Sequence, residues 1–111
     1  MYWMERSPDK KWGDDLPWKD QTTGKPLAFI PGKWHTLKTE IIMNTPGQKN
    51  GSINSWLDGQ LALSVKGIFR AEGATFGIDS LNFTTFFGGN TLDWAPVKDE
   101  VVYFADFSMK S

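Results

Sequence analysis

A two-residue turn signal in the middle of the chain constrains the fold more than any other feature. Asp58-Gly59 separates two runs, 52–57 and 60–65, in which apolar and polar residues alternate. Asp-Gly readily adopts the positive φ angles of a type I′ turn, which joins antiparallel strands directly. The two runs are therefore predicted to form a β-hairpin.

Alternation with a period of two assigns the side chains of this hairpin to two faces. One face is expected to hold Ile53, Leu57, Leu61, Leu63 and Val65. The opposite face is expected to hold Asn54, Trp56, Gln60, Ala62 and Ser64. Trp56 is thus expected to lie off the main core.

Other alternating runs indicate further strands. They cover residues 2–5, 34–43, 77–87 and 101–109. In the run 34–43, one face is expected to hold Leu37, Thr39, Ile41 and Met43, and the other face Thr36, Lys38 and Glu40. Pro46-Gly47 and Asn50-Gly51 mark turns, and no stretch has a helical period. Six or seven strands joined by turns indicate an all-β, antiparallel β-sandwich with under about 10% helix. We expect a single domain, 1–111, in which 1–33 is mostly loop with a short first strand and 34–109 is a strand-rich core.

The composition excludes several functional classes. The chain has 111 residues, a net charge of −1, one histidine and no cysteine. Scattered lysines do not suit double-stranded nucleic acid, no apolar run is long enough for a membrane helix, and thiol chemistry is absent. No nucleophile turn accompanies His35, so a hydrolase triad is not expected and His35 is interpreted as structural. No cofactor is expected, although carboxylate and carbonyl oxygens leave open a calcium site built from Asp79, Asp93, Asp99 or Asp106.

The aromatic content favours a carbohydrate ligand. Six of the 111 residues are tryptophan, and indole rings present apolar faces to the C–H faces of sugars while nearby polar groups bind hydroxyls or carboxylates. Burial in the core is the alternative for each ring. The candidate sugar-binding residues are Trp3, Trp12, Trp18, Trp56 and Trp94.

An ordered set of short motifs spans residues 31–107. It comprises Pro31-Gly32-Lys33-Trp34-His35-Thr36-Leu37, Met43-Asn44-Thr45-Pro46-Gly47, Asn50-Gly51-Ser52-Ile53, Trp56-Leu57-Asp58-Gly59, Phe83-Thr84-Thr85-Phe86-Phe87-Gly88-Gly89, Trp94-Ala95-Pro96 and Phe104-Ala105-Asp106-Phe107. In order and spacing, this set resembles the C-terminal half of the jelly-roll domain of polysaccharide lyase family 14, the alginate and glucuronan lyases.

The resemblance implies a jelly roll whose concave sheet binds an acidic polysaccharide that is cleaved by β-elimination. Tyr2-Trp3-Met4 aligns with a Tyr-x-Tyr pair of the family, which makes Tyr2 the candidate base or acid, and Lys38 is the candidate group that neutralises the uronate carboxylate. The strands that carry the family's catalytic Lys and Arg have no counterpart among these residues. Two alternatives therefore stay open: a noncatalytic carbohydrate-binding module and a structural, self-assembling β-sandwich.

The resemblance also sets expectations about partners and location. Because it covers half of a jelly roll, we expect self-association to a homo-oligomer that completes the sandwich. The partner is expected to be a polysaccharide, not a nucleic acid or a membrane. The family implies an extracellular location, and since residues 1–6 do not look like a signal peptide, we expect any leader to lie outside this chain.

Overall fold

The computed structural model describes residues 16–67, 69–85, 87, 89 and 91–111. The predicted strand 2–5 and the candidate residues Tyr2, Trp3 and Trp12 lie outside the described residues. The described residues fall into two compact units, which divide between Ile78 and Asp79.

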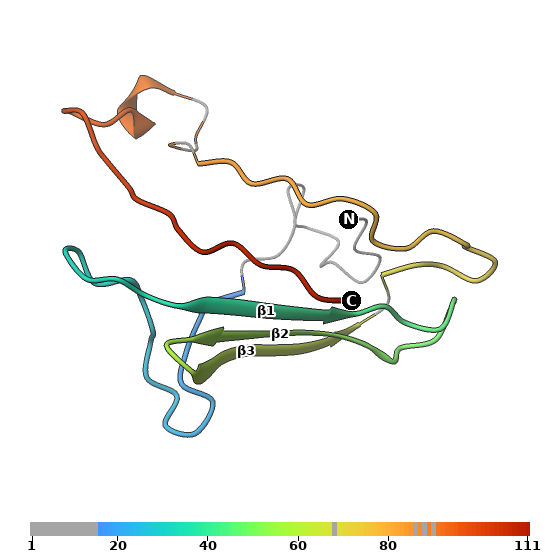
Figure 1. The fold of residues 1–111 in the computed structure, drawn as a ribbon. Coiled ribbons are helices and arrows are strands. Elements are labelled where there is room, and N and C mark those ends of the chain that lie inside the picture. The colour runs from blue at the N-terminus through green and yellow to red at the C-terminus, as the bar shows by residue number, and fades with distance from the viewer. Residues whose placement is uncertain (1–15, 68, 86, 88, 90) are drawn as a thin grey trace. The chain divides into compact units, whose positions relative to one another are not determined.

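The first unit contains a three-stranded antiparallel sheet with the order β1-β2-β3 (Figure 1). Its strands are β1 (Leu37–Ile42), β2 (Gly51–Leu57) and β3 (Gln60–Gly67). The described part of the chain is therefore all-β, as predicted, with one 3-10 turn, η1 (Leu92–Trp94), and no helix that could cross a membrane. A complete jelly-roll sandwich is not seen among these residues.

The turn between β2 and β3 confirms the hairpin prediction. Asp58 and Gly59 have φ angles of 51° and 80°, the two positive values that a type I′ turn requires. The Asp58 N–H also donates a hydrogen bond to the Thr36 carbonyl at 2.8 Å. The turn is thereby fastened to the residue that precedes β1.

The predicted faces of β1 and β2 are also confirmed by the register. Lys38 pairs with Trp56 and Glu40 with Asn54, while Leu37, Thr39 and Ile41 pair with Leu57, Ser55 and Ile53. Directly opposed residues of an antiparallel pair share a face. On the face that holds Leu37 and Ile41, the hydroxyl groups of Thr39 and Ser55 form a hydrogen bond of 3.0 Å.

A β-bulge interrupts the β2–β3 register and corrects the predicted faces of two residues of β3. Leu61 shares the face of Trp56 and Gln60 shares the face of Leu57, each opposite to the predicted face. Ser55 opposes Leu63 whereas Trp56 opposes Leu61, so Ala62 is the extra residue. A bulge changes the alternation from that point onward. Ala62 is fully buried, and its carbonyl accepts a hydrogen bond of 3.0 Å from the Lys19 N–H.

A buried asparagine anchors the far end of the sheet. Asn44 Oδ1 accepts the N–H groups of Phe69 and Arg70 at 2.9 and 3.0 Å, and its Nδ2 donates to the carbonyls of Thr45 and Arg70 at 2.8 and 2.9 Å. Asn44 and Phe69 are both fully buried. A Cβ at Gly51 would lie 2.6 Å from Cε2 of Phe69, which explains why glycine begins β2. The described core is small, since its only other buried hydrophobic residues are Leu57 and Ala62.

The second unit corrects two strand predictions. The described residues of 77–87 and 101–109 form no strand, and the backbone hydrogen bonds of this unit lie within and next to η1. An alternating run becomes a strand only where a neighbouring strand satisfies its backbone groups. What the second unit does contain is an aromatic cluster, in which the Phe83 ring lies edge-on to Phe104 at 4.6 Å and to Phe107 at 5.1 Å.

Candidate functional site

Lys38 and Trp56 form the central pair of the candidate site. They are cross-strand partners on the polar face of the sheet, and Nζ of Lys38 lies 4.6 Å from the centroid of the Trp56 ring. An ammonium group at this distance is attracted to the electron-rich face of the indole. The pair therefore holds a positive charge beside an apolar ring.

This pair lines a hollow of about 350 Å³ at one end of the sheet. Thr36 and Gly59 also line it. Thr36 directly precedes β1, and Gly59 belongs to the turn between β2 and β3. The hollow therefore lies where the start of β1, the end of β2 and the turn between β2 and β3 meet. Its volume is at the small end of the range for ligand pockets.

Asp58 holds two sides of the hollow together. Its Oδ1 accepts the Thr36 N–H at 2.9 Å, while its own backbone forms the turn that carries Gly59. This hydrogen bond, followed by a second one from the side chain of His35, lowers the pKa of Asp58 from its ordinary value. The carboxylate thus stays ionised and keeps Thr36 and Gly59 adjacent.

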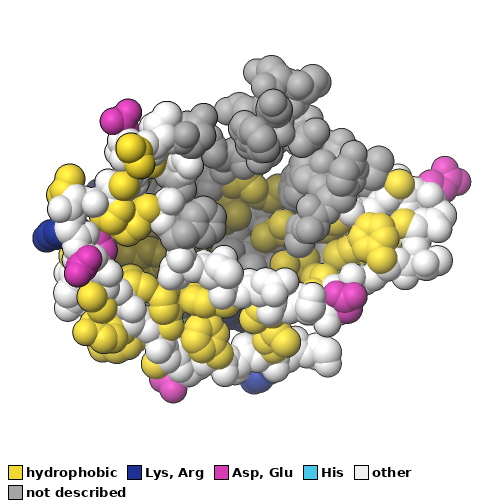
Figure 2. Space-filling model, turned by 90° about the horizontal axis from the view of Figure 1, so that it is seen from above, with side chains coloured by type: hydrophobic (Ala, Val, Ile, Leu, Met, Phe, Trp, Pro, Cys, Tyr) yellow, Lys and Arg dark blue, Asp and Glu magenta, His cyan; other side chains and the backbone are white. Residues whose placement is uncertain are grey.

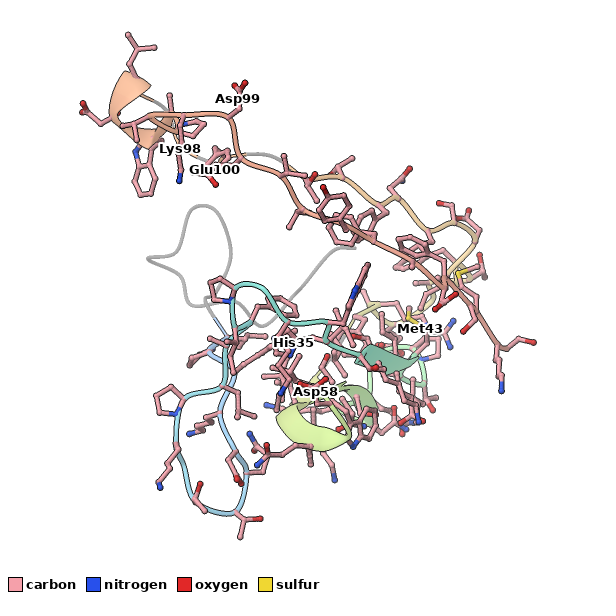
Figure 3. The ribbon with its side chains drawn as sticks, turned by 60° about the vertical axis from the view of Figure 1, so that its left-hand side comes forward. His35, Met43, Asp58, Lys98, Asp99 and Glu100 are labelled. Atoms are coloured by element: carbon pink, nitrogen blue, oxygen red, sulfur yellow. The ribbon has the colours of Figure 1, made fainter. Side chains whose placement is uncertain are left out.

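His35 extends this arrangement towards the segment before β1. Its Nε2 accepts the Ile30 N–H at 2.8 Å, so the ring proton lies on Nδ1 and is donated to Oδ2 of Asp58 at 2.6 Å (Figure 3). The His35 side chain is 6% exposed and lies edge-on to Phe29, with ring centroids 5.5 Å apart. Because both ring nitrogens are engaged in the chain's own hydrogen bonds, His35 has the structural role expected from the sequence.

The structure brings two of the sequence-predicted site residues together and places two others elsewhere. Lys38 and Trp56 are brought together, whereas Trp18 packs edge-on against Phe29 with centroids 5.7 Å apart. Trp94 belongs to η1 in the second unit and is 60% exposed. Among the described members of the predicted set, Lys38 and Trp56 are thus the ones that lie beside the hollow.

Sequence reasoning missed two features of this site. The first is that Thr36 and Gly59 line the hollow, and the second is the bond between His35 and Asp58. A signal for both existed in the Asp58-Gly59 turn, because an Asx side chain in a turn commonly binds a nearby backbone N–H. The particular partner, 22 residues earlier in the chain, depends on the strand register.

No metal-binding cluster is found among the residues that the structure describes: nowhere do three histidine or carboxylate side chains gather. Asp79, Asp93, Asp99 and Asp106, which the composition left open as calcium ligands, form no such cluster.

Comparison with known families decides what kind of protein carries this site. The polysaccharide lyase 14 family profile matches residues 19–107, which include the whole sheet and the hollow. The chain belongs to the polysaccharide lyase 14 family. This confirms the resemblance stated above, while comparisons with curated proteins and with solved structures give no significant match. Within this polysaccharide lyase domain, Lys38 and Trp56 lie on the polar face of the sheet.

Proposed function

We propose that the chain binds an acidic polysaccharide of the alginate or glucuronan type at the Lys38–Trp56 hollow and takes part in its cleavage by β-elimination. One observation carries this proposal: in a member of the polysaccharide lyase 14 family, an ammonium group and an indole ring line the same hollow. Such a pair complements a uronate, which combines a carboxylate with apolar C–H faces.

Lys38 suits the electrostatic part of this reaction. β-Elimination removes the proton from the carbon next to the uronate carboxylate, and negative charge develops towards that carboxylate. A cation beside it stabilises the charge and so lowers the barrier. Lys38 is exposed and stands next to the hollow, which makes its ammonium group accessible to a ligand.

Trp56 suits the positioning part. The ring is half-buried, so its orientation is restrained while part of its surface stays accessible. Aromatic anchors of this kind hold a ligand with little loss of conformational entropy. The distance between the sugar carboxylate and Lys38 would then be determined by how the sugar rests against the indole.

The proton transfers need further groups, and Tyr2 is the candidate carried over from the family resemblance. In the reaction, the C–H bond next to the carboxylate breaks and the base takes the proton. The electron pair forms the new carbon–carbon double bond, the glycosidic C–O bond breaks, and the leaving oxygen receives a proton from an acid. Tyr2 lies outside the described residues, so its role is tested by mutation.

The test is the ultraviolet absorbance of the unsaturated uronate formed on incubation with alginate or glucuronan. We expect absorbance to rise with the wild-type chain and to rise at least tenfold more slowly with Lys38→Met. Lys25→Met, which changes an exposed lysine of the 18–27 loop, is the matched control and should retain the wild-type rate. Wild-type absorbance that stays flat with both polymers would refute the catalytic part of the proposal.

A noncatalytic carbohydrate-binding module is the second candidate. It is favoured by the hollow itself, because the described residues that line it include no carboxylate, imidazole or phenol that could transfer a proton. Tyr2→Phe distinguishes the two functions, since it keeps the ring and removes only the ionisable hydroxyl. A lyase would lose turnover and keep its affinity, whereas a binding module would keep its affinity and have no turnover to lose. For either function we expect an extracellular location, as the family implies.

A further inference from the structure

The polar face of the sheet carries three rows of side chains that run across the strands. The register defines them, because directly opposed residues of antiparallel strands share a face. The first row contains the hollow's Lys38 and Trp56 together with Leu61, the second contains Glu40, Asn54 and Ser64, and the third contains Ile42, Ser52 and Lys66.

The second row is fixed by its own hydrogen bonds. Ser64 Oγ donates to Asn54 Oδ1 at 2.8 Å, and Asn54 Nδ2 donates to Glu40 Oε1 at 3.3 Å. These bonds orient the Asn54 amide and hold the Glu40 carboxylate over the sheet. An ionised carboxylate only accepts hydrogen bonds. Glu40 can therefore accept hydrogen bonds from the hydroxyl groups of a ligand, and it repels a carboxylate of the ligand.

Charge alternates from row to row along the strands. Lys38 is positive in the first row, Glu40 is negative in the second and Lys66 is positive in the third, and all three side chains are exposed. Successive rows are about 7 Å apart, since each step is two residues of a β-strand. A ligand that extends from the hollow along β1 therefore passes from a cation to an anion.

Resting on the proposed function, we propose that Glu40 determines specificity among acidic polysaccharides. The site then binds chains in which uronates alternate with uncharged sugars more tightly than it binds the uronate homopolymers alginate and glucuronan. The uronate carboxylate binds Lys38, and the uncharged neighbour places its hydroxyl groups over the row of Glu40, Asn54 and Ser64. A homopolymer of uronates brings a carboxylate to Glu40 instead. Two like charges about 4 Å apart in water repel enough to lower affinity roughly fivefold.

Calorimetry with two oligosaccharide probes of equal length tests this proposal. One probe is glucuronan, with a carboxylate on every sugar, and the other is hyaluronan, in which glucuronate alternates with an uncharged N-acetylhexosamine. We expect the wild-type chain to bind hyaluronan about fivefold more tightly. Glu40→Gln should remove most of this preference by strengthening glucuronan binding, with hyaluronan binding changed less than about twofold.

Glu72→Gln is the control, because it removes an exposed carboxylate that lies outside the three rows. It should leave the preference intact. Raising the salt concentration gives a measurement independent of mutation. The wild-type preference should shrink as the repulsion by Glu40 is screened, and the affinity ratio for Glu40→Gln should change less.

The possible outcomes separate this inference from the proposed function. Binding of both probes with equal affinity, or a preference that Glu40→Gln leaves unchanged, would overturn the role of Glu40 and leave the proposed function standing. Failure of the wild-type chain to bind glucuronan, hyaluronan or alginate would overturn both.

Discussion

Nδ1 of His35 lies 2.6 Å from Oδ2 of Asp58, and this contact joins the segment before β1 to the turn between β2 and β3. Oδ1 of the same carboxylate accepts the Thr36 N–H. The two bonds hold the segment around Thr36 beside the turn that contains Gly59, and Thr36 and Gly59 are two of the residues that line the hollow. The lining of the hollow is therefore positioned by the side chains of His35 and Asp58, which lie next to it.

We predict that His35→Ala lowers the free energy of unfolding by about 1–2 kcal/mol, because Asp58 loses a donor and the Ile30 N–H loses its acceptor. Urea denaturation measures this change. Trp34→Ala is the matched control, since Trp34 is the neighbouring ring and is 68% exposed. Equal effects of the two substitutions would contradict the role given to His35.

The pH dependence of stability should reflect Asp58. Its pKa is lowered in the folded chain, first by the Thr36 N–H and then by His35. A carboxyl group with a depressed folded pKa contributes stability above its ordinary value of 3.8 and loses that contribution as the pH falls through the folded pKa.

Asp58→Asn keeps an acceptor for Thr36 but removes this titration. We expect the variant to lose less stability than the wild-type chain between about pH 5 and pH 2, as measured by thermal unfolding. Asp99→Asn, an exposed carboxyl of the second unit, serves as the control. Parallel stability curves for wild type and Asp58→Asn would refute this prediction.

Asn44→Ala should be more damaging, with a loss of about 2–4 kcal/mol. The substitution removes the acceptor shared by the N–H groups of Phe69 and Arg70, and one of the two donors to each of the carbonyls of Thr45 and Arg70. Asn50→Ala provides the comparison, because Asn50 also bonds to Thr45 but is exposed, and it should cost about 1 kcal/mol or less. Denaturant unfolding that ranks Asn50→Ala as the more destabilising variant would be the contrary result.

Part of this architecture could be predicted from the sequence and part could not. Asp58-Gly59 specified the hairpin because its turn chemistry is local, and alternation correctly placed Lys38 and Trp56 on one face. Gln60 and Leu61 were assigned to the wrong faces because a bulge is a pairing event between two strands, which one strand's pattern does not reveal. The runs at 77–87 and 101–109 alternate just as well, yet their described residues form no ladder, because pairing depends on a partner strand.

We predict that the chain self-associates, and its exposed apolar surface supports this prediction. Large hydrophobic side chains lie at the surface of the described residues (Figure 2), among them Leu92 at 91%, Val101 at 70% and Phe107 at 63% exposure. Apolar surface of this extent is a common mark of an interaction site. We expect light scattering at micromolar concentration to show a dimer or larger homo-oligomer, and a stable monomer would count against it.

The central claim is that an acidic polysaccharide binds where Lys38 and Trp56 meet. Calorimetry with alginate and glucuronan oligosaccharides tests it most directly, by comparing the wild-type chain with Trp56→Ala and Trp34→Ala. We predict that Trp56→Ala weakens binding by about 1–3 kcal/mol, as expected for an aromatic anchor, and that Trp34→Ala leaves affinity nearly unchanged. Equal affinities for wild type and Trp56→Ala, or no binding by the wild-type chain, would contradict the claim.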